Sequence, residues 1–329
     1  MGLDSASPQE RQSLSTITQT TLSPLGFHLG VILLGFVITR LVYRLEDRTV
    51  AVLCLFIFMP ALYFRQALGQ NLASPEFSFV FFFYLFHTVT LYLVSKAVFS
   101  MIYFPLPTVP VGLMNVLITS ALGLRYIQDY ITRTIQAVQI THVILFYHSL
   151  IFALAGIYLI AAKKSFRHSV VKILCTPLPY AILLGTLFTL LQIQPYFILD
   201  PIDKLYVVCT PLVLLLIGLM AGNQVYFLDP SSYAAFLPGV GLCAGLRLAI
   251  SPLLAVAIVL MMGIDDMGIR RALIITSGLP TGLFACVLAG YYGKTDEKKF
   301  TILSILITTA FSLITLPLLV WMLNRWWPV

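Results

Sequence analysis

Residues 274–284 read IITSGLPTGLF and lie within an apolar run, residues 273–292, of about the length that a membrane-crossing helix needs. Pro280 has no N–H to donate, and its ring clashes with the carbonyl of Thr276, four residues earlier. The two glycines of the stretch loosen the backbone on either side of the proline. We therefore predict a membrane helix that is interrupted near its midpoint.

Lipid cannot hydrogen-bond the backbone groups that an interruption exposes, so protein or a polar cavity must satisfy them. Many transporters build a binding site from such a break, because the new helix start presents N–H groups and a partial positive charge. We predict that the N–H groups near Thr281 and Gly282, with the hydroxyls of Ser277 and Thr281, bind the anionic group of a substrate. The alternative is a simple proline kink without a site.

The composition is that of a membrane protein. Of the 329 residues, 59% are hydrophobic and only 10% are charged, whereas soluble domains carry about 25% charged residues. The formal net charge of +7 collects in short loops, and the five cysteines lie in apolar runs without a zinc or disulfide spacing. We expect no metal, no cofactor and no nucleic-acid partner. The expected partners are the lipid bilayer and a small substrate, and a homodimer remains an open alternative.

Ten apolar spans follow a flexible polar tail at residues 1–24. The first five spans, within residues 25–162, are residues 26–42, 50–68, 77–99, 110–124 and 140–162. A basic loop at residues 163–173 separates them from the second five, within residues 174–329, which are residues 174–191, 205–222, 237–262, 273–292 and 301–323.

The two sets of spans repeat the same order of features. Pro60 in the second span corresponds to Pro211 in the seventh, and the short, partly polar fourth span takes the place of the interrupted ninth. With an odd number of spans in each set, the two sets insert in opposite directions, as in the inverted repeats of secondary transporters. The predicted fold is an all-α polytopic membrane protein with ten transmembrane helices in two inverted five-helix repeats, in which broken helices of spans four and nine cross.

The positions of the basic residues predict the orientation. Cytoplasmic loops carry an excess of Lys and Arg, and the densest cluster lies at residues 163–173. We expect this loop on the cytoplasmic side and both termini on the non-cytoplasmic side of a plasma membrane or inner membrane.

A series of motifs, in order and spacing, resembles the auxin efflux carrier family of permeases. The motifs are MPALYF at residues 59–64, TPLPYAILLG at 176–185, TPLVLLLIG at 210–218, LRL at 246–248 with PLL at 252–254, LPT at 279–281, YYG at 291–293 and LP at 316–317. This family includes plant auxin exporters and bacterial carriers proposed for malate or malonate. The resemblance implies a secondary transporter that moves a small organic anion, a carboxylate, by alternating access with its site at the midplane.

The fourth span departs from the family pattern. Family members usually place an asparagine and a proline there, but no proline falls between residues 111 and 131 of this chain. Asn115 is the candidate counterpart of the asparagine, and Thr119 follows one turn later. Small polar residues could still open this helix, or the site has lost one half. The second possibility keeps an alternative function open, a transport-fold sensor or scaffold without net flux.

Arg247 is the strongest ionisable candidate, because charged residues inside membrane spans are costly and are usually functional. It lies about ten residues into the span at 237–262 and could pair with a carboxylate; the alternative is snorkelling to the interface. The chain lacks the HExxH and Walker motifs, so we do not expect an enzyme. The candidate substrate-binding residues are Asn115, Thr119, Arg247, Ser277, Gly278, Pro280, Thr281 and Gly282.

Overall fold

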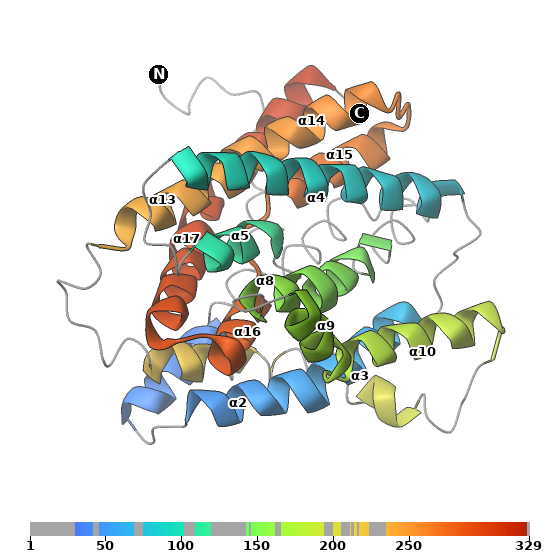
Figure 1. The fold of residues 1–329 in the computed structure, drawn as a ribbon. Coiled ribbons are helices and arrows are strands. Elements are labelled where there is room, and N and C mark those ends of the chain that lie inside the picture. Colours follow the sequence, from blue (N-terminus) through green and yellow to red (C-terminus); the bar gives the residue numbers. More distant parts are fainter. Residues whose placement is uncertain are drawn as a thin grey trace.

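The computed structural model describes residues 30–41, 46–68, 75–101, 109–119, 143–144, 146–161, 166–193, 200–204, 211, 214–215, 217–223 and 235–327. The regular elements in these ranges are helices, apart from one isolated β-bridge (Figure 1). The predicted all-α class is thus confirmed for the described part of the chain.

Four continuous helical segments are long and apolar enough to cross a membrane. They are residues 48–67 (α2, Asp47–Leu53, η2, Cys54–Phe58, and α3, Met59–Ala67), α4 (Pro75–Met101), residues 237–261 (α13, Leu237–Gly245, η5, Leu246–Ile250, and α14, Ser251–Met261) and α17 (Thr295–Trp326). The pair α9 (Phe166–Leu174) and α10 (Leu178–Leu190), bent by 58°, adds a fifth if it forms one span. These helices identify an integral membrane protein, while the ten-helix inverted repeat stays a prediction.

The remaining described helices include the short elements that build the centre of the molecule. They are the helix Gly30–Leu41, α5 (Val109–Leu117), α15 (Met267–Ser277) and α16 (Phe284–Tyr292). The helix Phe146–Ile160 overlaps two further elements, η4 (Phe152–Gly156) and α8 (Ile157–Ala161). In Figure 1, α4, α13, α14 and α15 lie at the top and α2, α3 and α10 at the bottom, with α5, α8 and α16 between them. Helix α5 contacts α4, α8, α13, α16 and α17.

Two of the wide π-helical turns are explained by a proline that follows one residue after the turn ends. Pro60 follows η2 and Pro252 follows η5, and each proline stands in the first turn of the next α-helix. Because proline donates no backbone hydrogen bond and pushes away the carbonyl four residues earlier, the ladder widens locally. In η5 this turn contains Arg247.

The predicted basic loop at residues 163–173 is partly helical, because residues 166–174 form α9. Ser169 is buried while Arg167 and His168 are exposed, so one side of α9 faces the protein. The ring of Phe166 lies 6.1 Å from that of Tyr158 and joins α9 to α8. The expected polar tail at residues 1–24 lies outside the described residues.

Exposed aromatic residues follow one face of α4. Phe79, Phe82 and Phe86 are each more than half exposed, and the outer face of α17 carries exposed Ile314 and Trp321 in the same way. A soluble protein rarely exposes apolar patches of this size. These faces are where we expect lipid.

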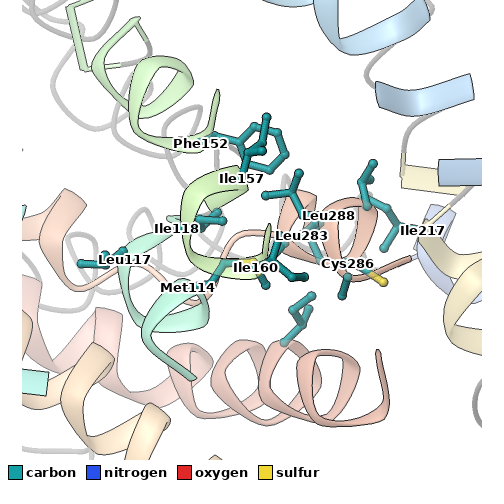
Figure 2. Packing of buried hydrophobic residues seen from close by; sticks show 14 of the residues in the cluster. Met114, Leu117, Ile118, Phe152, Ile157, Ile160, Ile217, Leu283, Cys286 and Leu288 are labelled. Atoms are coloured by element: carbon teal, nitrogen blue, oxygen red, sulfur yellow. The ribbon is translucent and has the colours of Figure 1, made fainter. Parts of the chain in front are cut away.

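The core packs around the middle of the molecule. Met114, Leu117 and Ile118, at the end of α5, belong to one apolar cluster with Leu283 and Leu288 (Figure 2). These residues come from the predicted fourth and ninth spans. The apolar core therefore holds the two interrupted spans against each other.

Candidate functional site: the crossing of two interrupted helices

Helix α5 ends within the predicted fourth span, although no proline is present there. After Leu117, Ile118 belongs to no regular element and Thr119 lies in a β-bridge. The Ile118 carbonyl accepts a hydrogen bond of 2.8 Å from the Gly282 N–H, and Thr119 forms an antiparallel β-bridge with Thr281. The end of α5 therefore contacts the break of the ninth span, while the crossing of two broken helices stays a prediction.

The ninth span is interrupted between Ser277, where α15 ends, and Phe284, where α16 begins. The Ser277 carbonyl accepts a 2.7 Å hydrogen bond from the Ser251 hydroxyl of α14. The Thr276 carbonyl accepts the Leu279 N–H at 3.3 Å. We expected Pro280 to leave the Thr276 carbonyl without a helical partner, but a tighter turn supplies one.

Arg247 joins the two interruptions from the side. Its Nε donates to the Leu279 carbonyl at 2.8 Å, its Nη1 to the Val116 carbonyl at 3.1 Å, and its Nη2 to the Thr119 hydroxyl at 2.7 Å. The side chain is only 2% exposed. One guanidinium thus donates to a backbone carbonyl from each of the two segments. Because the side chain is buried, Arg247 does not snorkel to the interface in this conformation.

The charge of Arg247 has no negative partner among the described residues. All three acceptors are neutral, and the described part of the chain shows no ion pair to this arginine. A buried charge without a counter-ion is costly. Within the described part of the chain, the crossing therefore holds a buried positive charge without a counter-ion.

The donors that we predicted for a substrate are already engaged. The Thr281 N–H donates to the Thr308 hydroxyl at 3.2 Å, and the Thr281 hydroxyl donates to the Asn115 carbonyl at 3.0 Å. The Ser277 hydroxyl donates to Ile274 within its own helix at 2.6 Å. Together with the Gly282 N–H, these groups hold the crossing closed. In this conformation they have no hydrogen left for an anion.

Glycine is required at position 282, where the two segments touch, whereas at position 278 a Cβ would meet only a flexible side-chain end. A Cβ on Gly282 would lie 2.4 Å from the Thr119 carbonyl oxygen, and one on Gly278 would lie 2.9 Å from the Leu319 side chain. These two residues and Pro280 therefore shape the break. Asn115 differs from them, because its fully buried amide has no hydrogen-bond partner at either atom among the described residues.

Two small cavities flank the crossing. The cavity on the Arg247 side, which we call the arginine cavity, has a polar lining of Tyr84, His87, Thr119, His148, Arg247 and Thr276. The second, the aromatic cavity, is lined by Tyr63, Gln66, Thr119, His148, Phe152 and Phe284, among others. Each has room for about one water molecule. A larger ligand needs the cavities to open.

Tyr84 and Thr276 belong to the arginine cavity but were missed in the sequence. The Thr276 hydroxyl donates to backbone carbonyls of its own helix, at 2.7 Å for Ala272. The hydrogen bond between the two hydroxyls is therefore donated by Tyr84. The only signal for Tyr84 was a tyrosine within the phenylalanine-rich third span, which does not distinguish a cavity residue from a packing residue.

Broken helices beside a buried polar site are a feature of many membrane transporters, and the described residues contain one such break next to a buried cation. Residues 158–321 match the family model described as membrane transport protein, and this part of the chain belongs to that family. The resemblance to auxin efflux carriers is thereby confirmed. The family consists of transporters rather than enzymes. No curated protein matches the chain.

Proposed function

We propose that this protein is a secondary transporter of a small organic anion, a carboxylate, that works by alternating access around the crossing of spans four and nine. The observation that carries this proposal is the buried guanidinium of Arg247, which has neutral acceptors and no carboxylate partner among the described residues. A substrate carboxylate would supply the missing negative charge.

The arginine cavity is where the anion would meet this charge. Arg247 has five N–H groups, three of its nitrogens each make one hydrogen bond, and the cavity wall also contains Thr119 and Ser277. Asn115 adds a buried amide without a described partner. We therefore assign substrate binding to Asn115, Thr119 and Arg247, with Ser277, Gly278, Pro280, Thr281 and Gly282 as the residues that shape the site.

The small size of both cavities fits a conformation in which the site is closed. A carboxylate enters only if the walls separate, and the aromatic cavity lies where α3 meets the helix Phe146–Ile160. The Ser149 hydroxyl donates to Gln66 across this boundary at 2.6 Å. Separation of these two helices would break that hydrogen bond and open a path to the crossing.

The test is uptake and counterflow in proteoliposomes with acetate, benzoate, malate and malonate as labelled probes. Arg247→Gln should abolish anion binding, measured as thermal stabilisation by the probe, while Arg271→Gln serves as the control. Arg271 is also a buried arginine, but it donates to carbonyls at the end of α17, including Trp327. If Arg247→Gln binds and transports the anions like the wild type, the proposal is wrong.

The alternative function is a sensor or scaffold that keeps the transport fold without net flux. Its main support was the missing proline of span four, yet α5 ends at Leu117 and the crossing forms without that proline. Binding of a probe without any counterflow of labelled probe would favour the sensor. Counterflow would exclude it.

A further inference from the structure

We propose that His148 is the second anion-binding group of the site and that it binds the anion in its protonated form, so that one proton is taken up with each anion. This inference rests on the proposed function. It concerns the helix Phe146–Ile160, which faces Arg247 across the arginine cavity.

The position of His148 is the first argument. His148 and Thr119 are the two residues that line both the arginine cavity and the aromatic cavity. The Thr119 hydroxyl is already held by Arg247 at 2.7 Å. A ligand that bridges the two cavities would lie beside the imidazole of His148 as well as Thr119.

The second argument is that the Nε2 atom of His148 is not engaged by any described residue, although it is buried. The ring packs edge-on against Tyr84, with 5.1 Å between the ring centroids. Buried polar atoms are nearly always hydrogen-bonded, and an exception often marks a functional site or the place of a bound water or ion.

His87 lines the same arginine cavity but is committed to a structural role. The Ser251 hydroxyl donates its hydrogen to the Ser277 carbonyl, so it has none for His87. His87 Nε2 must therefore carry a hydrogen, which it donates to the Ser251 carbonyl at 3.0 Å. His87 thus offers a matched comparison with His148.

The charges around His148 explain the linkage between proton and anion. The groups that face it are Tyr84 and His87 on α4, Arg247 on η5, and Tyr63 on α3 across the aromatic cavity. The hydroxyl of its neighbour Tyr147 donates a hydrogen bond to the Thr88 hydroxyl. None of the described residues that line either cavity is a carboxylate.

In the empty site, Arg247 therefore repels a proton on His148. A bound carboxylate offsets the charge of Arg247 and, where it lies beside His148, favours that proton. By thermodynamic reciprocity, the proton then favours the anion to the same extent. Proton and anion consequently enter together, and the net charge carried with a monocarboxylate is zero.

The experiment measures proton uptake during binding of acetate or benzoate to the purified full-length protein in weakly buffered detergent solution with a pH indicator. These probes stay ionised above about pH 6, because simple carboxyl groups titrate near pH 4. We expect close to one proton per bound anion. The affinity should fall by about tenfold per pH unit once the free site is deprotonated, since a single linked proton gives this slope.

His148→Gln should weaken anion binding, which then rests on Arg247 alone, and should lose the proton uptake and the pH slope. His87→Gln should keep both, which separates the two histidines of one cavity. Proton uptake that persists in His148→Gln, or anion binding by the wild type without proton uptake, would overturn the role of His148 and leave the proposed transport intact. A wild type that binds none of the carboxylates would overturn the proposed function and the proton step together.

Discussion

Thr119 and Thr281 face each other in an antiparallel β-bridge at the point where both interrupted helices leave their helical path. One of these residues belongs to the first half of the chain and the other to the second. The bridge lets each segment satisfy backbone groups of the other, as the Gly282 to Ile118 hydrogen bond shows. In a membrane interior, where water is absent, this exchange makes the two breaks mutually dependent.

The bridge predicts a disulfide in the double variant Thr119→Cys/Thr281→Cys, in a background with the exposed Cys175 replaced by serine. Opposed residues of an antiparallel pair have Cα atoms about 4.5–5.5 Å apart, which lies in the range that a disulfide spans. Mild oxidation should give a faster-migrating band on non-reducing gels. Each single variant serves as control, and a double variant that remains reduced would contradict the crossing.

Pro280→Ala should leave the helix broken. A new N–H at position 280 would have to compete with the Leu279 N–H for the Thr276 carbonyl. Arg247 also holds the Leu279 carbonyl in its present position. We expect the disulfide between positions 119 and 281 to form equally well in this variant. If cross-linking is lost while the protein stays folded, the helix has been repaired and Pro280 alone causes the break.

Gly282→Ala should destabilise the crossing by about 1–3 kcal/mol, the usual cost of overpacking. Its Cβ would lie 2.4 Å from a backbone oxygen that has little freedom to move. Gly241→Ala is the matched control, because a Cβ at that helical glycine meets nothing within 4 Å. The control should be neutral or more stable by up to about 1 kcal/mol. Thermal unfolding in detergent compares the two, and equal effects would contradict the close approach.

Thr281→Val should cost about 1–2 kcal/mol, because it removes the hydroxyl that donates to the buried Asn115 carbonyl. Thr281→Ser keeps the hydroxyl and should lie closer to the wild type. Hydrogen exchange measures the effect as faster exchange at the end of α5. A valine variant with unchanged protection there would show that this hydrogen bond does not stabilise the crossing.

The interruption of the ninth span could be predicted from the sequence, because Gly278, Pro280 and Gly282 act on the backbone locally. The importance of Arg247 followed from the cost of a charge within an apolar run. The crossing partner in span four was predicted by resemblance and by its place in the repeat. No proline marks the end of α5 in the sequence. The end is held instead by hydrogen bonds from Gly282 and Arg247, which are distant in the chain.

The hydrogen-bond partners could not be predicted. A sequence shows that a carbonyl is released, but the donor that reaches it depends on how distant helices pack. Arg247 serves both breaks because the π-helical turn before Pro252 sets its direction. The same packing engages Thr281 and Gly282, which we had assigned to the substrate, and leaves the His148 ring facing both cavities.

The bridge between Thr119 and Thr281 also imposes an order on biogenesis. The two residues are 162 positions apart (281 − 119), so the end of α5 leaves the ribosome long before its partner exists. At about 5–20 residues per second, the delay is about 8–32 s. During this time the carbonyls of Val116 and Ile118 need other donors. Water, lipid headgroups or the insertion machinery must supply these hydrogen bonds until the second half of the chain has been synthesised.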